Sequence, residues 1–271
     1  MIKLVDLLTE KIIKIPQSQL LKADSAFSYI KKNADSLKKK SPKSYIQDPY
    51  IPKSFKNIFN IEDLRGNLIS ISLGLYNDPK DNAYARMDQQ NRAVIVNISK
   101  LTDEYNFVTS IEHELVHAID PKAYDAELDA KLGVRAPKAP SKNASPDKIE
   151  QYEKDLIAHL NSPAEFDAHT STLINTIASG LAKKDKDKVA MSTVKSQLFK
   201  ALSDIKTKSY DEVYNKYKNT AVPFLFLRGP WIKDRIETAR DNFYSELVKI
   251  KAWSTDEQLY KRFLKRLSIE L

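Results

Sequence analysis

The sequence predicts an α+β fold that is mostly helical, with a small antiparallel sheet in the first half and a helical C-terminal half. Two observations predict this fold. Short segments of alternating or β-branched apolar residues, separated by polar turns, occupy residues 67–99, as expected of neighbouring strands. Apolar residues at helical spacing dominate the chain that follows. A length of 271 residues and an apolar content of 42% are enough for a sizeable core in one or two domains.

Residues 1–60 are predicted to be an N-terminal helical and loop region. Residues 1–11 favour an amphipathic helix that charges interrupt, whereas a signal peptide has an unbroken apolar segment. Residues 18–40 are predicted to be a helix because their apolar side chains recur in part at helical spacing. Residues 41–60 contain three prolines and several aromatic residues, and we expect them to be loop.

Three strands are predicted between this region and the next helix. They span residues 67–76, 83–87 and 92–99, and the polar turns 77–79 and 88–91 separate them. We expect them to pair as an antiparallel sheet that leads directly into the helix.

The helix after the strands carries the pattern His113-Glu114-x-x-His117. Thr102 is the predicted N-cap, and Pro121 ends the helix. One face is apolar and consists of Phe107, Val108, Ile111, Leu115, Ala118 and Ile119. All four histidines of the chain fall between residues 113 and 169.

This spacing predicts a metal site. Residues four apart on a helix lie one turn above each other, so both imidazoles can reach one ion. Glu114 then lies beside the open position of the metal, where it can take a proton from a bound water. The alternative is a solvated helix face with two histidines that bind nothing.

The segment HELVHAID resembles the active-site helix of the zincin metallopeptidases. Metzincins carry a third histidine six residues after the second, where this chain has Ala123, so the resemblance to that branch fails. The gluzincins, in which a second helix donates a glutamate, are more similar, and the candidate is Glu165. The segment SPAEFDAH, residues 162–169, also resembles the second motif of small HExxH proteins of phages and mobile elements. The resemblance to these small proteins covers roughly residues 90–180.

The residues of this second motif allow more than one role. Glu165 can also cap its own helix, in a capping box with Ser162 at the N-cap. His169 stands where a gluzincin has an aspartate that orients a ligand histidine, so it can be a ligand, a donor to a ligand or a stabiliser of the oxyanion. Asp120 is a further candidate ligand, although an aspartate before proline more often ends a helix. Asp167 is expected to point to the far side of the second helix, which makes it a weaker candidate ligand.

Residues 61–182 are expected to form the zincin-like core, and residues 183–271 a helical region packed on it. Residues 124–132 and 147–160 are predicted helices, and residues 133–146 between them are expected to be a surface loop. Residues 183–188 are a polar connector.

The last part of the chain adds further candidates. The apolar run 222–227 is expected to be buried, and two helices follow from Trp231. His159 is expected to be a surface histidine, and the alternative is that it faces the site as an accessory donor. The candidates for stabilising the oxyanion in this half are Arg228, Arg240 and Tyr244.

Composition limits the partners. The net charge is +8, and 35 of the 44 basic residues are lysine, which favours a solvated surface over the reading of nucleic acid by arginine. The densest basic run is Lys31, Lys32, Lys38, Lys39, Lys40 and Lys43. The absence of cysteine excludes disulfides and cysteine zinc ribbons. No apolar run approaches eighteen residues, so we expect no membrane span and a cytoplasmic or virion-associated protein.

The function expected from the resemblance is that of a zinc-dependent metalloendopeptidase. His113, His117 and Glu165 hold Zn²⁺, Glu114 is the general base for a metal-activated water, and His169 is a second catalytic residue. The substrate is a protein or peptide, and only the basic surface favours a nucleic acid as a partner. The alternative is a non-catalytic structural or interaction protein, such as a virion component, that retains the fold and the metal site.

Overall fold

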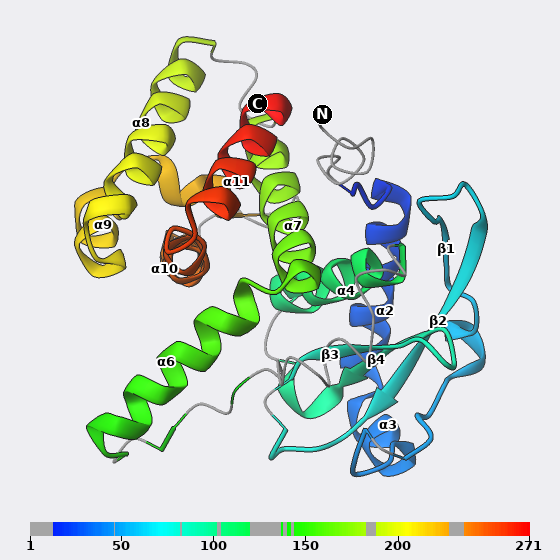
Figure 1. The fold of residues 1–271 in the computed structure, drawn as a ribbon. Helices are drawn as coiled ribbons and strands as arrows, with labels where there is room; N and C mark the ends of the chain where they lie inside the picture. Colours follow the sequence, from blue (N-terminus) through cyan, green and yellow to red (C-terminus); the bar gives the residue numbers. More distant parts are fainter. Residues whose placement is uncertain are drawn as a thin grey trace. The chain divides into compact units, whose positions relative to one another are not determined.

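The computed structural model describes residues 13–45, 47–81, 83–101, 104–119, 137, 140–141, 144–182, 188–227 and 236–271. The described residues form two compact units, one up to residue 119 and one from residue 137 onward. Figure 1 shows the elements of both units. The fold is α+β and mostly helical, as predicted.

The first unit combines a four-stranded sheet with three α-helices. Its elements are α2 (Gln17–Lys32), α3 (Ala34–Lys40), η1 (Lys53–Phe55), β1 (Phe59–Glu62), β2 (Leu68–Tyr76), β3 (Ala85–Asp88), β4 (Ala93–Asn97), η2 (Ile98–Lys100) and α4 (Glu104–Ile119).

The sheet is mixed, so the prediction of an antiparallel sheet was wrong. Its order is β1-β2-β4-β3, and β2 and β4 run parallel, with Leu75 opposite Val96. The prediction assumed that consecutive strands pair, whereas β3 lies at the edge of the sheet and β4 runs between β2 and β3 (Figure 1). All five residues of β4 are buried, which is typical of a strand in a parallel pair.

Two local features differ from the sequence-based expectation. Strand β1 begins in the last two residues of the segment predicted to be loop and was not predicted, and its residues alternate between buried and exposed from Phe59 to Glu62. The helix predicted over residues 18–40 is interrupted at Asn33. The amide side chain of Asn33 donates to the carbonyl of Tyr29 at 2.8 Å, and the backbone N–H of Asn33 donates to the same oxygen at 3.1 Å, so Asn33 caps the end of α2.

Helix α4 is held against the sheet by its apolar face. All six residues predicted for this face are buried, and the helix contacts β3, β4 and α2. The rings of Phe27 and Phe107 lie 5.4 Å apart between α2 and α4. At the end of α4, the Leu64 N–H donates to the Ile119 carbonyl at 3.3 Å. This contact ties the helix end to the turn between β1 and β2.

The second unit is helical throughout its regular elements, as predicted. They are α6 (Pro146–Leu160), α7 (Pro163–Ala182), α8 (Lys188–Thr207), α9 (Tyr210–Tyr217), η3 (Val222–Phe226), α10 (Ile236–Trp253) and α11 (Glu257–Glu270). The apolar run 222–227 is buried except for Phe224, which is 36% exposed. No helix within the described ranges combines the length and the apolar character needed to cross a membrane.

The core of the second unit fixes how α6 and α7 meet. Trp253 of α10 packs its ring against Phe166 at 5.4 Å, and its indole N–H donates to the Leu160 carbonyl at 3.1 Å. Farther along α7, an added Cβ on Gly180 would lie 2.9 Å from the carbonyl oxygen of Leu225. Glycine therefore allows η3 to approach the helix closely.

Some predictions concern residues outside the described ranges. They include the helices over residues 1–11 and 124–132, the Thr102 cap, Pro121 and residues 183–187. The domain boundaries predicted after residues 60 and 182 stay predictions.

Candidate metal centre

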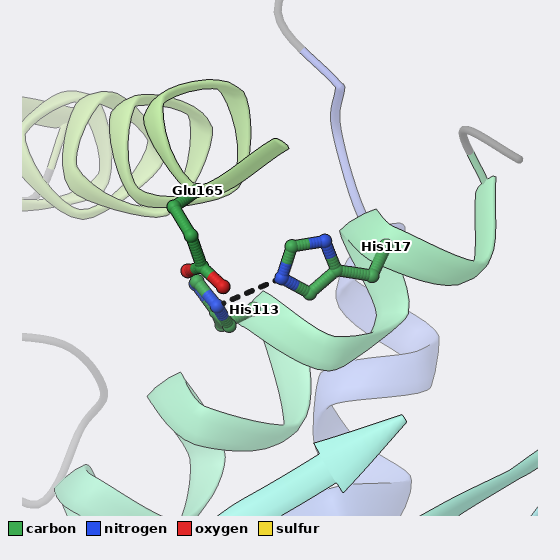
Figure 2. A group of neighbouring side chains, drawn as sticks. All are labelled: His113, His117 and Glu165. Atoms are coloured by element: carbon green, nitrogen blue, oxygen red, sulfur yellow. Dashed lines mark hydrogen bonds between the residues drawn. The ribbon is translucent and has the colours of Figure 1, made fainter. Parts of the chain in front are cut away.

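The two histidines of α4 face each other across one helical turn. Their Nε2 atoms lie 3.0 Å apart, and the ring centroids are separated by 4.6 Å with an interplanar angle of 87°. Figure 2 shows this pair together with Glu165 and marks the hydrogen bond between the imidazoles. Two nitrogens that can bind one ion thus converge on a common point, as the i, i+4 spacing predicts.

The spacing of these two nitrogens suits a small divalent metal. Zinc binds histidine nitrogen at 2.0–2.1 Å, and a tetrahedral arrangement then places two nitrogens about 3.3 Å apart. The observed separation of 3.0 Å requires only a slight opening of the pair. In the hydrogen bond, one Nε2 donates and the other accepts. A metal would replace the shared proton, because both nitrogens must then offer lone pairs.

The exposure of the motif changes over a few residues. Glu112 and Leu115 are fully buried, His117 is 6% exposed, and His113 and Glu114 are half-buried. Glu114 follows His113 and precedes His117 by three residues, so it belongs to the same helical turn as both.

The position of His117 is also fixed through its backbone. The amide side chain of Gln89, from the turn between β3 and β4, donates to the His117 carbonyl at 3.2 Å. The sequence predicted a polar turn at residues 88–91 but gave no sign that one of its side chains would support the histidine. The contact depends on how α4 packs on the sheet, which local patterns do not encode.

In the second unit, Glu165 lies in the first turn of α7 beside two other histidines. His169 Nε2 is 3.5 Å from Glu165 Oε2, and His159 Nε2 is 3.9 Å from Glu165 Oε1. The three side chains are between 14% and 22% exposed. The partly buried ring of His159 lies beside the carboxylate, which differs from the expected surface position and agrees with the alternative of an accessory donor.

The start of α7 agrees with the sequence prediction. Pro163 is its first residue, and the Phe166 N–H donates to the Ser162 carbonyl at 2.9 Å. Proline is favoured at this position because its missing N–H has no helical partner there. The carboxylate of Glu165 therefore emerges from a helix N-terminus, which favours a negative charge. The predicted capping box between Ser162 and Glu165 stays a prediction.

Other candidates from the sequence have structural partners. Asp167 accepts from Arg266 at 2.6 Å and from Arg262 at 3.3 Å, so it points away from Glu165 as predicted. Arg240 Nε donates to the Lys218 carbonyl at 3.0 Å. Tyr244 donates to Asp211 at 3.0 Å. These contacts connect α10 to α9 and the turn after it. Asp120 and Arg228 lie outside the described residues.

The structure thus brings the predicted site residues together in two groups. His113, Glu114 and His117 share one helix of the first unit, and Glu165 and His169 share one helix of the second. His113, His117 and Glu165 form a set of two imidazoles and one carboxylate that could hold a metal ion. The chain matches no family model, and neither a curated protein nor a solved structure matches it.

Proposed function

We propose that the protein is a zinc-dependent metallopeptidase of the gluzincin type. The observation that carries the proposal is the convergence of His113 Nε2 and His117 Nε2 at 3.0 Å. The residue between them that the mechanism requires, Glu114, is present and half-buried.

Glu165 is the third ligand in this proposal. Two imidazoles and a carboxylate are a donor set that zinc uses in hydrolytic sites that keep a position open for water. His159 and His169 support this role, because imidazoles beside each oxygen of a carboxylate restrict its orientation.

The side chains divide the chemistry among them. A zinc ion bound here would polarise a peptide carbonyl and make a water molecule more acidic. Glu114 takes the proton from the attacking water and passes it to the leaving amine. His169 holds the Glu165 carboxylate, with which it is in contact. The alternative role of His169 is stabilisation of the oxyanion. In that role, its replacement would lower the rate of cleavage and leave zinc affinity unchanged.

The test of this function is the variant Glu114→Gln. Glutamine has nearly the shape of glutamate but cannot accept the proton of the water. We expect the variant to keep its fold and its zinc while peptidase activity falls by at least about a hundredfold. The measurement is the cleavage of a general protein substrate, with zinc content and thermal unfolding determined on the same samples.

A matched control is Glu153→Gln, because Glu153 is exposed on α6 and lies outside the motif. This variant should cleave as fast as the parent. Undiminished cleavage by Glu114→Gln would identify another base and refute the proposed mechanism.

A further inference from the structure

The positive charge of the chain is concentrated in one segment of the first unit. Residues 29–56 contain eight lysines and two aspartates, a net charge of +6, whereas the whole chain has a net charge of +8. The lysines are Lys31, Lys32, Lys38, Lys39, Lys40, Lys43, Lys53 and Lys56. We call this segment the lysine surface, since all eight side chains are exposed.

The charges of this surface are not neutralised by the protein. Across the described parts of the chain, none of the eight ammonium groups has a carboxylate partner. Lys31 and Lys40 instead lie over the rings of Phe27 and Tyr50, at 5.8 Å and 5.9 Å from their centroids. Lysines elsewhere, such as Lys154 and Lys261, pair with a glutamate one helical turn away.

Exposed aromatic rings accompany these lysines. Among the described residues, three aromatic side chains are at least 36% exposed, and two of them, Tyr29 (43%) and Tyr45 (42%), belong to this segment. Both rings are held in place. Tyr29 packs edge-on against Phe55 at 5.3 Å, and the guanidinium of Arg86 lies 4.4 Å from the centre of the Tyr45 ring.

The contacts also show that the segment folds back on itself. Phe55 lies between Lys53 and Lys56 in sequence, and its contact with Tyr29 brings η1 to the end of α2. Lys40, at the end of α3, lies over Tyr50. The contacts of Tyr29 and Lys40 therefore connect the ends of α2 and α3 to the chain that follows them.

Helix electrostatics explain only part of this arrangement. Lysines in the last turns of α2 and α3 favourably oppose the negative ends of the helix dipoles. That effect does not account for Lys43, Lys53 and Lys56, which lie outside both helices, or for the exposed tyrosines. Cations that follow a backbone, together with rings on which bases stack, are what single-stranded nucleic acids bind.

We propose that the lysine surface binds single-stranded nucleic acid through its phosphates and bases, without sequence specificity. Lysine contributes charge without the fixed fork by which arginine recognises a base, so affinity should depend on charge and stacking. None of its residues belongs to the proposed metal centre, and its test does not depend on peptidase activity.

The experiment measures the binding of a fluorescein-labelled 20-nucleotide oligo(dT) to the full chain by anisotropy at several salt concentrations. The test variant changes Lys38, Lys39 and Lys40 to glutamine. The control changes Lys148, Lys200 and Lys261, three exposed lysines of the second unit, and removes the same net charge. We expect the test variant to bind at least tenfold more weakly at 50 mM salt. Its log–log salt slope should be smaller by about 2, because each phosphate contact on a single strand contributes about 0.7.

Two further arms separate base stacking from simple charge attraction. Tyr29→Leu keeps an apolar contact with Phe55 but removes the stacking ring, and we expect binding to weaken at least about fivefold. Thermal unfolding confirms that each variant is folded, and Tyr45→Leu supplies an independent variant if Tyr29→Leu is not. Duplex DNA and vesicles with 30% phosphatidylserine are the competing ligands. Equal weakening by the test and control triples, or tighter binding to duplex or vesicles than to oligo(dT), would overturn the proposal.

Discussion

The histidine pair of α4 and the carboxylate of α7 are positioned by different physical means. The pair is set by the hydrogen bonds of one helix, so its 3.0 Å separation follows from residues four apart. Glu165 depends on tertiary packing. Trp253 contacts Phe166 and Leu160, which follow Glu165 and His159 directly in the sequence. Trp253 therefore contacts both the segment that carries the carboxylate and the segment that carries its neighbouring histidine.

This difference indicates which half of the centre is easier to disturb. A helical turn keeps its geometry when distant residues change, because its hydrogen bonds are local. A side chain placed by the packing of three helices moves when any of them shifts. We therefore expect changes in the packing around Glu165 to lower zinc affinity more than changes around the histidine pair do.

The largest effect among the predictions that follow is expected for Glu165→Gln. An amide oxygen is a weaker donor to zinc than a carboxylate, so affinity should fall tenfold or more, about 1.4 kcal/mol at least. Asp167→Asn is the matched control, because Asp167 lies two residues away and pairs with the buried Arg266. It should lower the free energy of unfolding by about 1–3 kcal/mol and leave zinc affinity unchanged.

These two variants separate a ligand from a structural residue. Zinc competition titration and thermal unfolding of the metal-free protein give the two quantities. If Glu165→Gln binds zinc as tightly as the parent, Glu165 is not a ligand and the gluzincin assignment fails.

A smaller effect is expected for His169→Ala. If His169 holds the Glu165 carboxylate, its loss should weaken zinc binding about threefold to tenfold, near the lower end of the effects of such supporting residues. The measured quantities are zinc affinity and the rate of peptide cleavage with saturating zinc.

The pattern of losses identifies the role of His169. A fall in rate with unchanged affinity would assign this residue to the oxyanion. A loss of affinity greater than that of Glu165→Gln would make it the ligand instead. His159→Ala is the parallel variant, and its effect should be smaller because its contact with Glu165 is longer.

The smallest expected effect is on the pH dependence of stability, through Asp24 in the unit that carries α4. Burial, with the nearby charge of Glu104 as a second cause, raises the pKa of Asp24 from 3.8 to about 6. Between pH 3.8 and about pH 6, the folded state therefore binds more protons than the unfolded state. The stability that Asp24 contributes is fully present below pH 3.8 and is lost as the pH rises through about 6. Asp24→Asn should flatten this dependence and stabilise the protein at pH 8 by less than ~1 kcal/mol, since Asp24 is partly exposed.

Unfolding by urea at pH 4.5, 6 and 8 measures this contribution. Asp35→Asn, at an exposed position of α3, is the control for the removal of one carboxylate from the same unit. An unchanged pH dependence in Asp24→Asn would contradict the assignment.

How far the sequence predicts the structure depends on the range of the interactions. The i, i+4 spacing of His113 and His117 and the apolar face of α4 were predictable, since helical geometry alone relates them. Strand β1 was missed because its four residues follow a proline-rich segment, although their alternation was visible. The parallel pairing of β2 with β4 depends on where β3 lies, which no local pattern determines.

The same distinction applies to the site. The position of Glu165 at the start of a helix was predictable from Pro163. Its contact with His159 was not, because it depends on the turn between α6 and α7 and on Trp253, more than eighty residues away in sequence. The support of His117 by Gln89 likewise joins residues that only the folded sheet brings together.

The most direct test of the proposed centre is the metal content of the full chain purified without added metal. Elemental analysis should find about one equivalent of zinc per chain, and removing it with a chelator and restoring it should be reversible. Less than about a tenth of an equivalent of any transition metal, not restored by incubation with zinc, would contradict the assignment of His113, His117 and Glu165 as ligands.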